Sequence, residues 1–186
     1  MKRGILGTFL MAAALVATAG ASSKDIPTAP RTDADLAKAV RHEILMYPHY
    51  TLWDDVSFQV QNGSVELLGD VSQPYKKSDL QKIVQHVPGV TAVTNELKVL
   101  PLSPFDDQLR VRVARAIYSD PTLSRYSMGA IPQIHIIVDN GHVTLTGAVN
   151  TAMEKQIAGM RASGAGRAFG PIVNNLTVDN PPHKKS

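Results

Sequence analysis

The chain has 186 residues, of which 44% are apolar, 19% charged and only 5% aromatic. This is the balance of a folded globular protein whose core is mostly aliphatic. The absence of cysteine excludes disulfides, thiolate metal sites, cysteine nucleophiles and a lipid-modified cysteine. The formal net charge of +3 includes Lys2 and Arg3, and without them 19 − 2 = 17 basic residues face 16 acidic ones. This near balance, with no dense basic run, gives no reason to expect a nucleic-acid partner.

The N-terminal segment has the three regions of a secretory signal peptide. A basic start precedes an apolar stretch at residues 5–16 and then Ala19-Gly20-Ala21, which fits cleavage before Ser22. Ala17-Thr18-Ala19 is a competing cleavage site. An uncleaved anchor is the alternative, but the apolar run is shorter than the roughly 20 residues that a spanning helix needs. We therefore expect removal of residues 1–21, a periplasmic location and no transmembrane anchor afterwards.

Two segments of the chain repeat each other. The run from Val60 to Val71 recurs at constant register from Val138 to Val149, with matching Asn-Gly pairs and apolar positions. Apolar positions upstream and downstream of this run also match between the copies. The difference in residue number between matching positions is constant within each block but changes from block to block, so the second copy carries extra residues before and after its hairpin. Three collinear matching blocks indicate two copies of one structural unit.

The repeat defines the expected domain organisation. We expect a linker at 22–32, one domain at 33–100, a second at 106–179 and a disordered tail at 180–186. Domains of about 70 residues are near the size at which a lone core is marginal, so the two copies could dock. The outer sheet faces offer Gln59, Leu68 and Ile137 for such contact.

Each copy begins with a predicted helix. Leu36, Val40 and Ile44 recur every four residues, as one stripe of a helix does. Thr32 with Asp35 resembles a capping box at its start. The second copy repeats the stripe with Leu109, Val113, Ala116 and Ile117.

A hairpin follows in each copy. Asn62-Gly63 and Asn140-Gly141 stand between runs of alternating apolar residues. This is the strongest short hairpin signal, because both residues of the tight turn must adopt positive φ.

A second helix and a last strand complete each copy. Leu80, Ile83, Val84 and Val87 have helical spacing, and Thr151 to Glu154 is a capping box. Because the last strand follows a helix, the connection predicts a crossover to a parallel strand. The expected fold class is α+β: two tandem α-β-β-α-β repeats, each a three-stranded mixed sheet with two helices on one face.

These motifs resemble the BON domain: the run Val60–Val71 with Gly89–Val99, and Val138–Val149 with a looser Ile172–Val178. Two copies behind a signal peptide resemble the family's osmotically inducible periplasmic type. The resemblance implies an envelope location, attachment to phospholipid membranes and a link to osmotic stress, with no catalytic residue and no cofactor. The second copy departs from the pattern, since alignment gives Ala168-Phe169 where the family has Gly-Val.

The first helix of the second copy carries a group of candidate contact residues. Arg110, Arg112 and Arg115 are followed by Tyr118, and basic groups of this kind attract anionic lipid headgroups. A solvated helix face is the alternative. Lys76 and Lys77, at the start of another helix, are expected to be solvated.

Two loop aromatics extend the candidate set. Trp53, the sole tryptophan, lies in the loop after the first helix, where it could reach a membrane interface or close the end of a small core. Tyr126 falls in the longer loop of the second copy, which could form a recognition loop.

The sequence contains no recognisable catalytic or metal constellation. His135 and His142 share a hairpin but lack a third ligand, and Asp106-Asp107 has no acid–base partner. We therefore expect no enzyme activity, no metal and no cofactor. The leading hypothesis is a periplasmic protein that binds an anionic phospholipid surface or an envelope protein. The alternative is a chaperone-like or small-ligand binding protein without lipid contact, marked by an exposed apolar groove between the repeats.

Overall fold

The structure is a computed structural model that describes residues 32–129, 131–166 and 168–179. The first domain contains helix α1 (Asp33–Met46), strands β1 (Asp55–Gln61) and β2 (Ser64–Val71), helix α2 (Pro74–Gln85), and strands β3 (Ala92–Asn95) and β4 (Lys98–Val99). The second domain contains helix α3 (Pro104–Tyr118), a 3-10 turn (Ser124–Ser127), strands β5 (Ile134–Asp139) and β6 (His142–Val149), helix α4 (Ala152–Gly164), and strands β7 (Val173–Asn174) and β8 (Thr177–Val178). The α+β repeat is confirmed in both copies.

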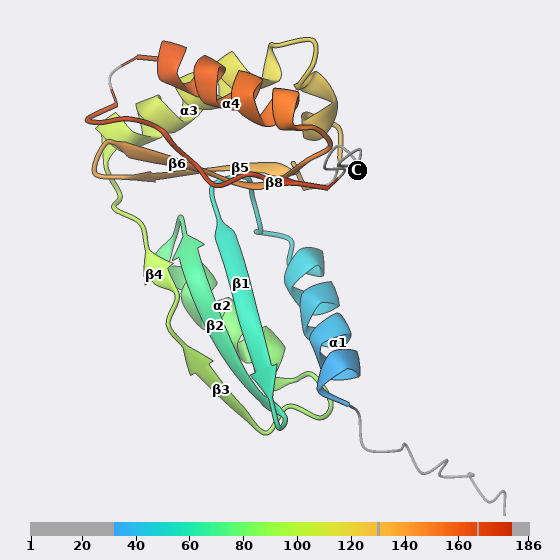
Figure 1. Cartoon of the computed structure of the whole chain (residues 1–186). Helices are drawn as coiled ribbons and strands as arrows, with labels where there is room; N and C mark the ends of the chain where they lie inside the picture. Colours follow the sequence, from blue (N-terminus) through green and yellow to red (C-terminus); the bar gives the residue numbers. More distant parts are fainter. Residues whose placement is uncertain (1–31, 130, 167, 180–186) are drawn as a thin grey trace, which may run out of the picture.

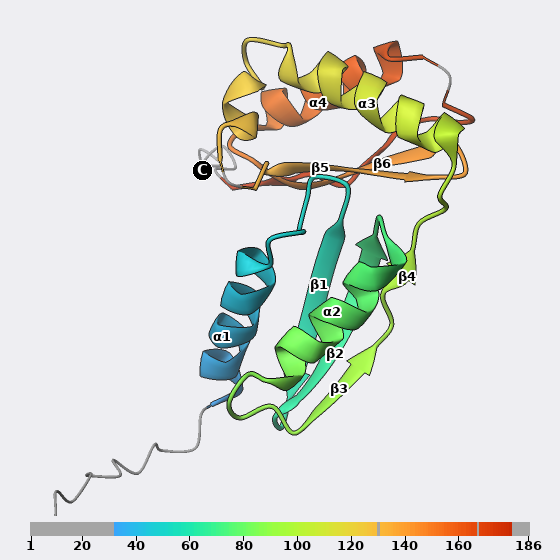
Figure 2. The same ribbon diagram turned by 180° about the vertical axis from the view of Figure 1, so that it is seen from behind.

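The two domains have the same sheet topology. In the first, β1 pairs antiparallel with β2, and β3 and β4 pair parallel with the other side of β2. In the second, β5, β6, β7 and β8 repeat this arrangement. The two helices of each domain cover the same face of its sheet (Figures 1 and 2). Each layer pair therefore encloses one aliphatic core.

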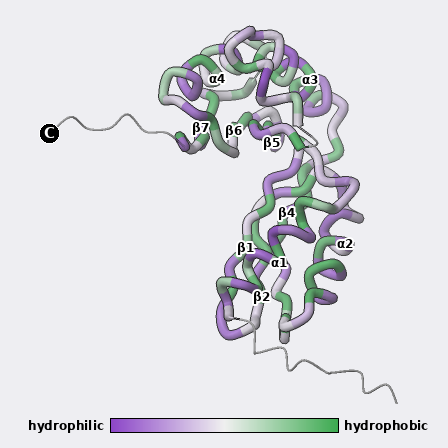
Figure 3. Tube along the Cα trace, turned by 90° about the vertical axis from the view of Figure 1, so that its right-hand side faces the viewer, coloured by the Kyte–Doolittle hydropathy of each residue, from purple (hydrophilic) through white to green (hydrophobic). Residues whose placement is uncertain are grey.

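The predicted helical stripes face these cores. Leu36, Val40 and Ile44 are buried against the inward side chains Val65 and Leu67 of β2. Figure 3 shows hydrophilic and hydrophobic positions alternating along the helices, as expected for helices with one buried face. Among the described helices, none is long and apolar enough to cross a membrane.

The last strand of each copy is broken, where the sequence predicts a continuous strand. The side-chain oxygen of Asn95 accepts a 3.2 Å hydrogen bond from the backbone N–H of Leu97, and this local turn directs Leu97 into the core. Asn174 and Leu176 form the same contact at 3.4 Å. A short polar side chain that bonds two residues ahead competes with the strand ladder, which explains the break.

The helix-to-strand turn of the second copy differs from the expected alignment. The backbone N–H of Phe169 donates to the carbonyl of Gly141, as that of Thr91 donates to Gly63, both at 2.9 Å. The alignment that relates the two hairpins thus continues through Phe169, which corresponds to Thr91. Ala168 therefore corresponds to Val90 and not to Gly89. The extra residue of the second copy lies after this turn.

The hairpin turns are held from the first helix of each domain. Asn62 has φ 50° and Gly63 has φ 79°, and Asn140 and Gly141 have the same values. The carboxylate of Asp33 accepts the amide N–H groups of the first turn at 2.8 and 3.0 Å. Asp106 binds those of the second turn at 3.0 and 2.8 Å. These aspartates occupy equivalent positions at the start of the first helix of each copy, so the contact belongs to the repeat.

Candidate functional site

Two of the predicted contact residues, Arg110 and Tyr118 on α3, form hydrogen bonds with the outer edge of β5. The guanidinium of Arg110 donates to the carbonyl of Val138 at 2.9 Å and to the carboxylate of Asp107 at 2.5 Å. The hydroxyl of Tyr118 donates to the carbonyl of Ile134 at 2.5 Å. Arg110 is 4% exposed, which corrects its expected place on a contact surface: it satisfies backbone groups that an edge strand leaves open.

The loop between α1 and β1 reaches across to the same edge. The backbone N–H of Ile136 donates to the carbonyl of Leu52 at 2.8 Å. The half-buried side chains of Leu52 and Trp53 pack against the core of the second domain. Trp53 therefore lies between the two domains and has a packing role, which agrees with the core-closing alternative rather than with the membrane interface, although the core is that of the second domain. Figures 1 and 2 show this loop pointing at the second sheet, on the side away from α3 and α4.

A salt bridge supports the docking at the other end of β5. Lys98 on β4 donates to the carboxylate of Asp139 at 2.5 Å, and this pairing raises the pKa of Lys98. Ile137, which the sequence placed on the outer sheet face, is buried. The repeats are therefore docked, through both polar and apolar contacts.

Tyr126 is buried inside the second domain, so it forms no exposed recognition loop. Its hydroxyl donates to the carboxylate of Glu154 at 3.0 Å and accepts the N–H of Asn150 at 2.8 Å. Arg125 pairs with the same carboxylate. Burial alone would raise the pKa of Glu154, but hydrogen bonds from Thr151 and Tyr126 hold it below the usual value. This cluster anchors the long loop to the start of α4.

The corresponding place in the first domain holds a buried ion pair. Lys76 donates to Asp54 at 2.7 Å, and both side chains are almost fully buried. Asp54 also accepts hydrogen bonds from Ser72 and Thr51. Burial would raise the pKa of Asp54, but the bonds from Lys76, Ser72 and Thr51 hold it below the usual value. The expectation that Lys76 is solvated is therefore wrong.

Arg112 and Arg115 remain as cationic groups on α3 without an acidic partner. Arg110, Arg125 and Arg161 of this domain are each paired with a carboxylate, whereas no ion pair among the described residues involves Arg112 or Arg115. Arg115 is exposed and Arg112 half-buried. Within the part of the chain described, two guanidinium nitrogens of Arg112 are buried without a hydrogen-bond partner. Val111, which is 49% exposed, lies beside them.

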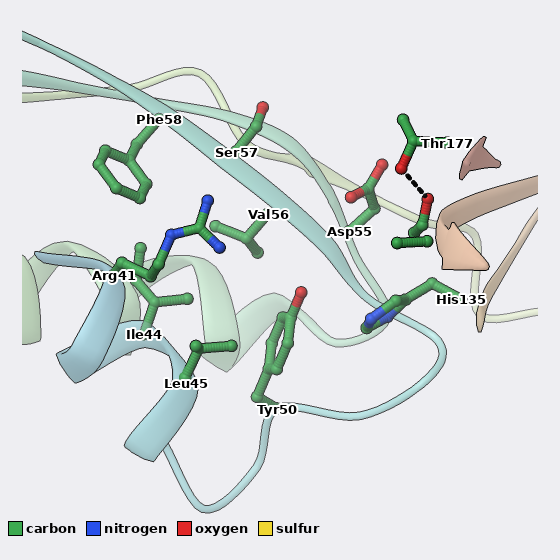
Figure 4. A pocket seen from close by; sticks show the side chains of 12 residues that line it. Arg41, Ile44, Leu45, Tyr50, Asp55, Val56, Ser57, Phe58, His135 and Thr177 are labelled. Atoms are coloured by element: carbon green, nitrogen blue, oxygen red, sulfur yellow. Dashed lines mark hydrogen bonds between the residues drawn. The ribbon is translucent and has the colours of Figure 1, made fainter. Parts of the chain in front are cut away.

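A cavity of about 450 Å³ lies where the two domains meet. One wall is the last turns of α1, another is β1, and the second domain closes the end with His135, Gly147, Ala148 and Thr177. Figure 4 shows Tyr50 pointing from the loop toward β1, with His135 on one side and Arg41 on the other. Its lining mixes polar and apolar groups, unlike the apolar groove of the alternative hypothesis.

Two titratable groups in this cavity are shifted by burial. Burial raises the pKa of Tyr50 to about 12. Burial lowers the pKa of His135, against the opposing charge of Asp55. The rings of Tyr50 and His135 lie 5.6 Å apart. Burial therefore favours the uncharged form of both the Tyr50 and the His135 side chain at this end of the cavity.

In the described residues no three histidine or acidic side chains come together in a group that could hold a metal ion. His142 lies on the same hairpin as His135, but its ring lies beside Gly170, near the turn.

Sequence reasoning missed two polar features that organise the domains. The first is the pair of turn-binding aspartates, Asp33 and Asp106, whose equivalence in the repeat could have identified them. The second is the Asp54–Lys76 pair, which has no signal in the sequence because its partners are brought together only by the tertiary fold.

Comparison with protein families identifies the domain type. The family model described as "BON domain" matches residues 32–101 and again 105–180. The search of curated proteins gave no match.

Among solved structures, the C-terminal domain of CdsD, a structural protein of the type III secretion system of Chlamydia trachomatis, is 16% identical, with a TM-score of 0.31. The alignment covers 80% of this chain and 67% of that one. A second CdsD structure has the same identity and TM-score, with coverage of 78% and 61%. The two family matches span most of the chain, which therefore belongs to the BON-domain family and carries two tandem copies of the domain.

Proposed function

We propose that this protein is a non-enzymatic binding protein of the bacterial envelope, which attaches to anionic phospholipid surfaces through the outward face of α3. Export by residues 1–21 would place it in the periplasm; these residues lie outside the described part of the chain. The BON family supports an envelope role, and the charge arrangement on α3 supports the ligand.

The unpaired arginines carry the proposal. Arg112 and Arg115 are the arginines of α3 that no carboxylate neutralises among the described residues, whereas Arg110 is used within the fold. Gln108, Val111 and Arg115 recur at helical spacing and share the face opposite the core, and the half-buried Arg112 lies at the margin of this face. A basic group near an anionic membrane contributes about 1 kcal/mol, and the exposed Val111 adds apolar contact.

Co-sedimentation with vesicles tests this proposal. The purified mature chain would be mixed with phosphatidylglycerol–phosphatidylcholine vesicles and with pure phosphatidylcholine vesicles, at low and high salt. We expect binding to the anionic vesicles alone, weakened by salt because Arg115 is exposed and Arg112 is only half-buried.

Two matched double variants distinguish an effect of the α3 arginines from an effect of the protein's net charge. Arg112→Glu with Arg115→Glu should weaken binding at least tenfold, because two favourable charges of about 1 kcal/mol each are reversed. Lys38→Glu with Lys82→Glu makes the same charge change on exposed positions of α1 and α2 and should weaken binding much less. Equal losses in both double variants, or no vesicle binding, would contradict the proposal and favour a protein or small-molecule ligand.

A further inference from the structure

The first domain has an edge strand, β1, whose outward backbone groups are largely open. The two-residue turn makes Gln61 and Ser64 the first hydrogen-bonded pair of the hairpin. Because such pairs alternate along an antiparallel ladder, the N–H and C=O groups of Val56, Phe58 and Val60 point away from β2. These three positions correspond to Ile134, Ile136 and Val138 of β5.

The two edges differ in what covers them. On β5, a tyrosine hydroxyl, the backbone carbonyl of Leu52 and an arginine guanidinium occupy the three positions. On β1, Tyr50 lies at the backbone of Val56. In the described residues no hydrogen bond reaches the outward groups of Phe58 and Val60.

The cause is visible in the repeat. In the register that aligns α1 with α3, Ala37 and Leu45 stand where α3 has Arg110 and Tyr118. Neither alanine nor leucine has a side-chain donor. The first domain therefore lacks the side-chain caps that the second domain has.

The cavity between the domains opens beside this edge. Val56, Ser57 and Phe58 line one wall, and Arg41 and Leu45 of α1 line the facing wall. Arg41 is exposed and has no ion-pair partner in the described chain. The corresponding edge of β5 already binds a backbone group from outside its sheet, since the carbonyl of Leu52, in the turn between α1 and β1, accepts the N–H of Ile136 there.

We propose that β1 binds an extended peptide segment of a partner protein by adding it as a strand, with an acidic side chain of the peptide facing Arg41. The edge supplies backbone hydrogen bonds at Phe58 and Val60, and the cavity receives the side chain. Main-chain pairing gives affinity in this mode of recognition, and pockets for alternate side chains give specificity. This site is separate from the arginines on α3.

Fluorescence anisotropy with a defined peptide tests the proposal. The probe is fluorescein-labelled Thr-Val-Thr-Glu-Thr-Val-Thr, in which the valines and the glutamate share one face of a strand. We expect saturable binding to the full mature chain. The same peptide with an N-methyl group on its central glutamate lacks one edge-facing N–H and should bind about fivefold or more weakly. A central lysine in place of the glutamate should weaken binding about threefold.

Two protein variants complete the design. Ala37→Arg with Leu45→Tyr transplants the caps of the second domain onto β1 and should abolish peptide binding. Arg41→Glu should reverse the preference between the glutamate and lysine peptides without changing the edge. Thermal unfolding of each variant checks that it folds, and the two modified peptides test the site in the unaltered protein.

The outcomes are distinct. Loss of binding on capping, with reversal by Arg41→Glu, supports strand addition. Absence of saturable binding to the unaltered protein, or equal binding to the capped variant, overturns it. Neither result depends on vesicle binding by α3, so the two proposals fail separately.

Discussion

The backbone N–H of Ile136 donates a 2.8 Å hydrogen bond to the carbonyl of Leu52, and this bond joins the edge strand of one repeat to a loop of the other. Exposed strand edges promote unwanted pairing between chains, and proteins commonly cover them. Here the cover for the second repeat comes partly from the first. The tandem arrangement is thus a structural unit as well as a duplication.

The hydrogen bond from the Tyr118 hydroxyl to the edge of β5 should stabilise the folded protein. Tyr118→Phe removes the hydrogen bond to Ile134 and leaves a covered carbonyl without its partner, which should lower the free energy of unfolding by about 1 kcal/mol. Tyr75→Phe, at an exposed position on α2, is the matched control and should change it little. Urea denaturation measures both, and equal values would show that the cap does not stabilise the fold.

The buried ion pair predicts a larger effect. Lys76→Met leaves the Asp54 carboxylate buried without its cation, which should cost about 3–5 kcal/mol. Lys77→Met, one residue along the same helix, should cost far less, because the Lys77 side chain forms no ion pair in the described structure. Chemical denaturation at neutral pH separates the two variants, and a small loss for Lys76→Met would mean that Asp54 is solvated.

His135 predicts a pH dependence of stability. Its pKa is lowered in the folded protein by burial, so the unfolded chain binds the proton more readily. The stability contribution is complete above the ordinary value of 6.5 and is lost as the pH falls below it. Asp54 and Glu154, whose folded pKa values lie below 3.8 and 4.5, keep their contribution to stability throughout this range and lose it only at more acidic pH.

A titration of unfolding isolates this group. We expect the free energy of unfolding to fall between about pH 7 and pH 5, and His135→Gln should flatten that slope. An unchanged slope in the variant would assign the effect to other histidines.

A glycine in the second hairpin predicts a strong backbone effect. Gly147 has φ +104°, and a Cβ there would lie 2.0 Å from the carbonyl oxygen of Gln133. Gly147→Ala should therefore cost at least about 2 kcal/mol, from strain and collision. Gly164→Ala places a Cβ in open space at the end of α4 and should be neutral or stabilising by up to about 1 kcal/mol. Thermal unfolding compares the pair, and similar midpoints would contradict this.

The sequence predicts the repeat and its elements well, because the relevant signals are local. Leu36, Val40 and Ile44 are buried as their spacing requires, and both Asn-Gly turns have positive φ. The break in each last strand was not predicted, since it depends on a side-chain bond of Asn95 or Asn174 within an otherwise regular apolar pattern.

The candidate site was harder to predict, because side-chain type does not determine what a side chain contacts. Arg110, Arg112 and Arg115 look alike in sequence, yet the first reaches the edge of β5 and the others have no acidic partner in the described chain. The contact between Leu52 and Ile136 is made by backbone atoms, so neither residue type signals it. Only the tertiary arrangement separates these roles.

The contrast between the covered edge of β5 and the open edge of β1 can be measured directly by residue-resolved amide hydrogen exchange of the mature protein. The structure predicts slow exchange for the N–H of Ile136, which is bonded to Leu52, and fast exchange for the N–H of Phe58, which has no partner in the described chain. Adding the glutamate peptide should slow exchange at Phe58 and leave Ile136 unchanged. Fast exchange at Ile136, or protection of Phe58 in the free protein, would contradict the docking of the two domains and the open edge on which the account depends.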